Sequence, residues 1–125
     1  MNGRPSIPSG ITAELLLDVF DLPISFHRCL VPITGGVTAA LMLSQAIWTS
    51  EALDPEVGGW FCRSQEEWTE ETGLSRWEQE TARRALRTGG FLEERRAGMP
   101  AKLWFRVRPE AVGRALQAHA NPVRR

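Results

Sequence analysis

Recurring apolar residues at helical spacing, or capping residues that mark a helix start, occur in five stretches of the chain, which therefore predict five helices. The stretch 37–51 is the most apolar of them, and its spacing predicts a buried helix that the others pack against. The expected buried stripe consists of Val37, Ala40, Leu41, Ser44, Ile47 and Trp48. The first helix, 11–20, ends before Pro23, and its apolar side chains predict that it packs on the body of the protein or on a second copy of the chain.

A last helix begins at Pro109, because the first helical position loses nothing when its residue lacks a backbone N–H. Its inward side chains are expected to be Ala111, Val112, Ala115 and Leu116. The stretch 24–33 is rich in residues that favour strands, but Pro32 restricts it to an edge strand or an extended arm. A Thr-Gly-Gly sequence at 34–36 then separates this stretch from the buried helix.

The middle of the chain predicts two helices joined by a sharp turn. Gly73 suits the left-handed backbone conformation that closes the first helix, because glycine has no Cβ to clash. Ser75 and Glu78 form a Ser-x-x-Glu capping box for the second helix, and Ser64 and Glu67 repeat the device before the first. Two short helices with separate start signals and a glycine turn between them are the sequence form of a helix-turn-helix.

The second of these helices has two different faces. At about 100° per residue, the side expected to pack inward carries Glu78, Ala82, Ala85 and Leu86. The opposite side carries Arg76, Trp77, Glu80, Arg83, Arg84 and Arg87. Small inward residues let a helix lie close to its scaffold while long cationic side chains project outward, as a helix in the major groove of DNA requires. A solvated surface helix with Arg–Glu pairs explains the same pattern equally well.

Strands are predicted on either side of this pair of helices. A short strand at 60–62 precedes them, and 91–96 and 102–108 form a hairpin around a turn at 97–101. In the last strand the inward positions are Leu103, Phe105 and Val107, and the outward ones are Lys102, Trp104, Arg106 and Arg108. Three cations surround the tip of the hairpin: Arg95, Arg96 and Lys102. Because this hairpin directly follows the arginine-rich helix, the sequence favours the wing of a winged helix over an ordinary β-hairpin.

The chain has 125 residues, enough for one domain with a core, and its composition is that of a soluble globular protein. We expect a leader and helix at 1–23, the winged-helix domain at 24–108, and a helix and tail at 109–125. The formal net charge is zero, but residues 75–108 hold nine basic residues against four acidic ones. A localised basic face on a neutral protein is compatible with DNA binding of moderate strength.

Other chemistries have little support in the residues. Cys29 and Cys62 lack the spacing of a metal or redox motif, and His27 has no ligand partner at a recognised spacing. The sequence at 34–36 lacks the ending of a phosphate-binding loop, and the acidic run at 66–71 has no histidine near it. We therefore expect no catalytic residues, no metal and no cofactor. No stretch has the pattern of a secretion signal or a membrane span, so the expected location is the cytoplasm.

Four segments resemble winged-helix domains of phage and mobile-element proteins: TGGVTAALMLSQAIW at 34–48, GGWF at 58–61, ETGLSRWEQETAR at 71–83 and GMPAKLWFRV at 98–107. Such domains are typically the N-terminal DNA-binding modules of replication-initiation or replisome-organiser proteins, and of related regulators. The resemblance implies a mainly α-helical fold with a small β-hairpin, in which a three-helix core and a two-stranded wing gain extra N- and C-terminal helices. Trp77 stands where such domains often carry a basic or polar residue.

The sequence thus favours double-stranded DNA as the partner, in a replication or transcription role. In the second helix, the expected contacts come from Arg76, Trp77, Arg83, Arg84 and Arg87. In the wing and at the capped helix start, they come from Arg95, Arg96, Lys102, Arg106 and Ser64. The alternative is a protein partner bound by Trp77, Trp104 and the arginines, since tryptophan and arginine are common at binding hot spots. A homodimer through the helix at 11–20 is a separate hypothesis.

Overall fold

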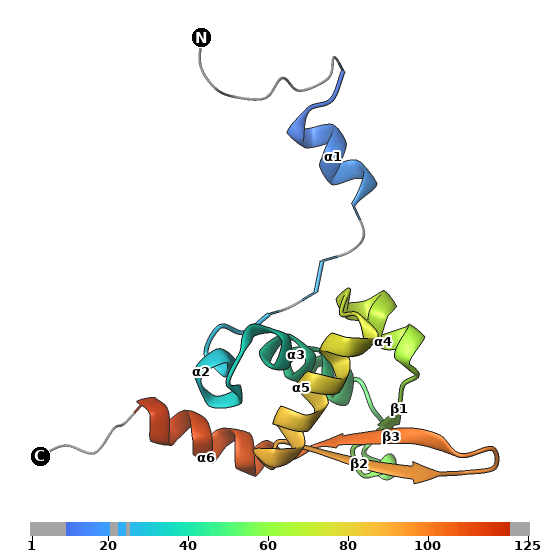
Figure 1. The fold of residues 1–125 in the computed structure, drawn as a ribbon, viewed down its shortest axis with the longest axis vertical. Helices are drawn as coiled ribbons and strands as arrows, with labels where there is room; N and C mark the ends of the chain where they lie inside the picture. The colour runs from blue at the N-terminus through green and yellow to red at the C-terminus, as the bar shows by residue number, and fades with distance from the viewer. Residues whose placement is uncertain (1–9, 21–22, 25, 121–125) are drawn as a thin grey trace, which may run out of the picture.

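The structure is a computed structural model in which residues 10–20, 23–24 and 26–120 are described (Figure 1). The first helices are α1 (Ala13–Val19), α2 (Leu30–Thr34) and α3 (Val37–Glu51). After the 3-10 turn η1 (Pro55–Val57) and β1 (Trp60–Cys62) come α4 (Gln65–Thr72) and α5 (Arg76–Thr88). The last elements are β2 (Leu92–Ala97), β3 (Lys102–Val107) and α6 (Pro109–Ala120). The expected leader before residue 10 and tail after residue 120 lie outside the described residues.

The three strands form one antiparallel sheet in the order β1–β3–β2. Phe61 and Glu94 lie on either side of Phe105, one in each neighbouring strand. The sequence predicts a two-stranded hairpin and a separate short strand, but β1 pairs with β3 and so covers one edge of the hairpin. The described chain is thus mainly helical with a small three-stranded antiparallel sheet, an arrangement compatible with a winged-helix domain.

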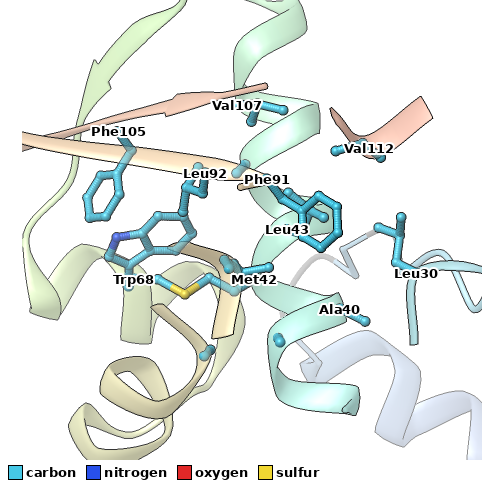
Figure 2. Packing of buried hydrophobic residues seen from close by; sticks show 14 of the residues in the cluster. Leu30, Ala40, Met42, Leu43, Trp68, Phe91, Leu92, Phe105, Val107 and Val112 are labelled. Carbon is cyan, nitrogen blue, oxygen red and sulfur yellow. The ribbon is translucent and has the colours of Figure 1, made fainter. Parts of the chain in front are cut away.

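The core lies between α3, α4, α5 and one face of the sheet (Figure 2). Met42 and Leu43 of α3 are almost completely buried in it, as are Trp68 of α4 and Phe105 of β3. The Trp68 ring meets the Phe105 ring edge-on, with 5.4 Å between the ring centroids. These contacts confirm that α3 is the enclosed helix around which the others pack.

The buried face of α3 differs from the stripe that its spacing predicts. Val37 and Trp48, both members of that stripe, are 59% and 61% exposed. The buried residues are Ala39, Ala40, Met42, Leu43, Ser44, Gln45, Ala46 and Thr49. Because almost every position of this helix is apolar or small, its sequence favours no single face, and packing against α5 and the sheet decides the orientation.

The sequence predicts an extended segment at 24–33. This prediction is wrong for the last residues, because Leu30–Thr34 form the helix α2. Pro32 is the third residue of this helix and lies in its first turn, where a backbone N–H would have no helical partner. Gly35 closes the helix in the left-handed conformation, with φ at 91°. The Leu30 side chain is buried, and α2 packs against α3 and α6.

The two outer helices differ in how they pack. α1 begins after Thr12, whose Oγ1 accepts a hydrogen bond from the backbone N–H of Leu15 at 3.1 Å. Leu15, Leu16 and Leu17 are exposed, so packing of these side chains on the body of the protein, one of the two expected arrangements, is not observed. α6 does pack on the body through the residues predicted for it, with Val112 the most deeply buried. Among the described residues, no helix is both long and apolar enough to cross a membrane.

Candidate nucleic-acid interface

The pair α4–α5 has the cap geometry that the sequence predicts. Before α4, the Ser64 side chain accepts from the Glu67 backbone N–H at 3.1 Å, and the Glu67 carboxylate accepts from the Ser64 N–H at 2.8 Å. Ser75 and Glu78 make the same two bonds before α5, at 3.1 and 2.9 Å. Gly73 closes α4 with φ at 78°, a conformation that favours glycine. Both capping boxes and the glycine turn are therefore confirmed.

A buried glutamine fixes the arrangement of α4 and α5. The Gln79 side-chain amide donates to the backbone oxygens of Gln65 and Leu74, both at 3.1 Å, and to Thr69 Oγ1 at 2.9 Å. The sequence pattern assigns the inward position to Glu78, which is wrong, because the capping box turns this carboxylate back to the exposed start of α5. Gln79 takes the inward position and ties both helices and the turn together.

A pocket of about 500 Å³ separates the starts of α4 and α5 from the hairpin. Several parts of the chain supply cationic side chains to its walls: Arg63, Arg76, Arg83, Arg96 and Lys102. Ser64 and Glu67 line it at the start of α4. Five of the site residues predicted from the sequence thus meet around one concave surface, which we call the basic pocket.

Two arginines of α5 are bound to Glu94 of β2. Arg83 makes a bidentate ion pair with it, Nε to Oε2 at 2.9 Å and Nη2 to Oε1 at 2.7 Å, and Arg87 Nη1 lies 2.9 Å from Oε2. Burial by itself raises the pKa of Glu94, but the hydrogen bonds and charges of Arg83 and Arg87 outweigh it, so that the pKa is lowered. Glu94 therefore balances one of the two positive charges within the protein and engages the donors of Arg83 most fully.

The other predicted cations of α5 and the hairpin tip are unpaired. Among the described residues, no ion pair is made by Arg76, Arg84, Arg96 or Lys102. Arg84 and Trp77 lie on the side of α5 opposite its buried residues, and Trp77 is 77% exposed. The positive charge that remains available thus extends from the exposed side of α5 across the basic pocket to the tip of the hairpin.

Arg95 and Arg106 do not share this surface, contrary to the prediction. Their strand positions place them on the opposite face of the sheet, because side chains alternate along a strand. The Trp60 ring centroid there lies 4.4 Å from the guanidinium carbon of Arg95 and 4.8 Å from that of Arg106. Arg106 Nε is also paired with Glu93 at 2.6 Å. These two arginines therefore hold the outer face of the sheet together.

Trp104 lies on the same outer face, opposite Arg95 and Cys62 in the strand register. Its ring is half-buried, and its indole N–H is buried with no hydrogen-bond partner among the described residues. The sequence predicts that Trp104 points outward as an anchor for a protein partner, but the residue is only partly exposed. Of the two predicted anchors, Trp77 is the one that stays exposed.

The start of α4 is less available to an anion than the sequence predicts. The Glu67 carboxylate accepts the backbone N–H of Ser64, and this hydrogen bond is the main reason that the pKa of Glu67 is lowered. A carboxylate therefore already occupies the positive end of the helix, where we expected a phosphate.

Two residues of this region, Arg63 and Glu94, are not among the site residues predicted from the sequence. Arg63 lines the basic pocket, and its Nε pairs with Glu71 at 2.7 Å. Its position directly before the capped start of α4 is a signal that the sequence does contain. Glu94 has no such signal, because its contact with Arg83 depends on β2 lying beside α5.

The described residues contain no group of three or more His, Cys, Asp or Glu side chains that is placed to hold a metal ion. Neither Cys29, which is exposed, nor Cys62, which is partly buried, forms a disulfide. The side chains that line the basic pocket offer hydrogen-bond donors and positive charge, supplied mainly by arginine.

No protein-family model matches the sequence, and no curated protein matches it. Among solved structures, the chain is similar to one described as the N-terminal domain of a DNA binding protein, with a TM-score of 0.45 and 16% sequence identity. The similarity covers 92% of this chain and 97% of the other. A similarity at this level carries no argument about function, which rests here on the geometry of the site.

Proposed function

We propose that this chain is a winged helix-turn-helix protein that binds double-stranded DNA without catalysing a reaction, as a replication or transcription regulator of the phage or plasmid type. The order helix, strand, helix, helix, strand, strand from α3 to β3 supports the fold. The basic pocket between α5 and the hairpin supports the ligand. The proposal includes the homodimer through residues 11–20 that the sequence predicts.

The observation that carries the proposal is the gathering of unpaired cations around the basic pocket. Arg76 comes from the start of α5, Arg96 from β2 and Lys102 from β3, so segments far apart in the sequence form one positive surface. A duplex presents phosphates at regular spacing along both sides of each groove. Cations on both a helix and a neighbouring hairpin suit contacts with two such rows of phosphates.

Within α5, we assign the DNA contacts to Arg76, Trp77 and Arg84. Arg84 is free to bind guanine through two donors, whereas Arg83 has its donors engaged by Glu94. Arg83 therefore belongs to the internal framework of the protein, which revises the role that the sequence predicts for it.

The salt dependence of binding to random duplexes, measured by fluorescence anisotropy, tests the proposal. If the four unpaired cations each neutralise one phosphate, the logarithm of affinity should fall with the logarithm of salt concentration with a slope of about −3.6. Affinity should then drop roughly 100-fold between about 50 and 200 mM salt. An affinity that stays constant over this range would contradict phosphate binding.

A single substitution tests the assignment of the pocket. Arg76→Ala should weaken binding to every duplex by about tenfold, because it removes one unpaired cation from the interface. Arg114→Ala is the matched control. Arg114 is exposed on α6, so this substitution removes the same charge at a position outside the pocket. Equal losses in the two variants would mean that only net charge matters and that the pocket is not the binding site.

The alternative function is binding of a partner protein, and the 77% exposure of Trp77 favours it. Trp104 does not support it, because its ring is half-buried against the outer face of the sheet. A contact anchored by an aromatic ring depends little on salt, whereas phosphate contacts depend on it steeply. If the chain binds a partner in a way that requires Trp77 and persists at high salt, that partner is a protein and not DNA.

A further inference from the structure

The tip of the hairpin is exposed and apolar. The turn 98–101 that joins β2 to β3 reads Gly-Met-Pro-Ala, and each of its residues is exposed. It carries no polar side chain, although asparagine, aspartate and serine are common in exposed turns. Figure 1 shows that the tip projects beyond the helices. The Met99 side chain is 100% exposed, the highest value among the large apolar side chains of the described residues.

The fold does not depend on Met99. Gly98 provides the left-handed backbone conformation of the turn, with φ at 97°. In the turn between α4 and α5, by contrast, a side chain holds the backbone, because Thr72 Oγ1 accepts from the Leu74 N–H at 3.1 Å. A side chain that lies completely in solvent adds no packing to the folded state. Met99 is therefore free to contact a partner.

The two most exposed large apolar side chains of the described residues lie beside the basic pocket. Trp77, at 77%, is second to Met99. Trp77 directly follows Arg76, which lines the pocket on the helix side. Met99 precedes Ala101, which lines the pocket on the hairpin side, by two positions, so their Cα atoms are within about 8 Å of each other. Apolar groups that border one cationic surface in this way mark a binding surface more clearly than scattered ones do.

We propose that Met99 enters the minor groove as a wedge and unstacks one base step, so that the duplex bends when the protein binds it. Proteins that bind the minor groove combine arginine or lysine with an apolar wedge, such as methionine or proline, that enters between two base pairs. Arg96 and Lys102 lie next to the tip and line the basic pocket. The unbranched, flexible side chain of methionine adapts readily to an irregular apolar space. This inference rests on the proposed function, because it concerns the same interface.

The wedge defines a class of preferred duplex. The minor groove presents mainly hydrogen-bond acceptors, and the side chains of Met99 and Pro100 have no donor to offer them. Recognition at the tip would therefore depend on how easily a step is unstacked and not on the identity of its bases. Pyrimidine–purine steps such as TA are easily kinked, whereas A-tracts are stiff. The preferred substrate is a duplex with a pyrimidine–purine step where the tip enters.

Two measurements on the full chain test the wedge. Energy transfer between dyes at the two ends of a duplex of about 30 base pairs measures bending, and fluorescence anisotropy measures affinity. The wild type should bend a duplex of alternating T and A, and bind it about tenfold tighter than an A-tract of the same composition. Met99→Gln keeps the length of the side chain but makes it polar, so it should lose most of the bend and reduce the preference below about threefold.

Two further variants serve as controls. Met99→Leu keeps an apolar side chain and should retain both the bend and the preference. Val57→Gln makes the same kind of change at an exposed apolar residue that does not line the basic pocket, and it should behave as the wild type. Circular dichroism checks that all variants remain folded, as the full exposure of Met99 leads us to expect.

The outcomes separate the wedge from DNA binding itself. A wild type that binds duplexes without bending them would overturn the wedge and leave the proposed function intact. The same holds if Met99→Gln bends the alternating duplex as strongly as the wild type, or prefers it to the same degree. If the wild type binds no duplex at low salt, the proposed function is wrong and the wedge is wrong with it.

Discussion

Adjacent charged residues of β2 have different environments, and comparing the two faces of the sheet shows why. Arg96 lines the basic pocket, whereas Arg95 lies on the outer face over the Trp60 ring. Glu94 binds arginines of α5, whereas Glu93 binds arginines of the outer face. The residue types are the same on both faces, and strand alternation alone separates them. A count of cations in the hairpin therefore overstates the charge that a polyanion can reach.

The outer face uses its arginines to hold the sheet, and the pocket face leaves part of its charge unpaired. On the outer face, Arg106 pairs with Glu93 and lies over Trp60. On the pocket face, Arg76 and Arg96 have no such partner among the described residues. We expect substitutions on the two faces to have different effects, one on stability and the other on binding.

The largest expected effect is the loss of duplex affinity when two arginines are removed from the pocket face. Arg76→Ala/Arg96→Ala should weaken duplex binding roughly 100-fold, because each arginine contributes about 1–3 kcal/mol if it contacts DNA. Arg95→Ala/Arg106→Ala removes the same charge from the outer face and should change affinity less than about threefold. Fluorescence anisotropy at one fixed salt concentration measures both. Similar losses in the two double variants would remove the distinction between the faces.

The second-largest expected effect is on the free energy of unfolding, and it should differ between Trp60 and Trp77. Trp60→Ala should lower the free energy of unfolding by about 1–3 kcal/mol, because it removes two cation–π contacts and the packing of the ring. Trp77→Ala should change it by less than about 0.5 kcal/mol, since this ring is largely in solvent. Urea denaturation measures both values. An equal loss in the two variants would mean that Trp60 does not organise the outer face.

A smaller effect is expected from releasing the arginines that Glu94 holds. Glu94→Gln should raise duplex affinity by about three- to tenfold, because it removes a negative charge beside the pocket and frees Arg83 and Arg87 for phosphates. Glu93→Gln is the matched control on the outer face and should leave affinity unchanged. If Glu94→Gln weakens binding instead, the ion pair positions α5 for DNA rather than limiting its charge.

The smallest expected effect is the pH dependence of the stability that Glu94 contributes. The pKa of Glu94 is lowered from its ordinary value of 4.5, so its carboxylate stabilises the folded state above that pH, and this stabilisation is lost as the pH falls through the lower folded value. The difference in free energy of unfolding between wild type and Glu94→Gln should therefore shrink when the pH falls from about 6 to about 3. Urea denaturation at these two pH values measures it. A difference that is independent of pH would show that charge is not what stabilises the pair.

Several features of the site follow from short stretches of sequence. The capping boxes that begin with Ser64 and Ser75 join residues three positions apart, and Gly73 is required by a local backbone angle. The spans of α3, α4, α5 and the hairpin follow from apolar spacing and turn residues in the same way.

Other features depend on which distant segments meet. The buried face of α3 could not be predicted, because the helix is apolar on every side and α5 selects the face that it covers. The pairing of Arg83 with Glu94, and the stacking of Arg95 on Trp60, join residues on different elements. Spacing along the chain carries no information about such contacts.

The sequence by itself therefore determined where most of the helices and strands lie, with α2 as the exception, since these signals act within about four residues. The tertiary structure alone decided which arginines are paired with carboxylates, which tryptophan is exposed, and that Leu15, Leu16 and Leu17 of α1 stay in solvent. The physical reason is that neutralisation and burial depend on the distance between side chains in space. That distance is set by how the helices pack on the sheet.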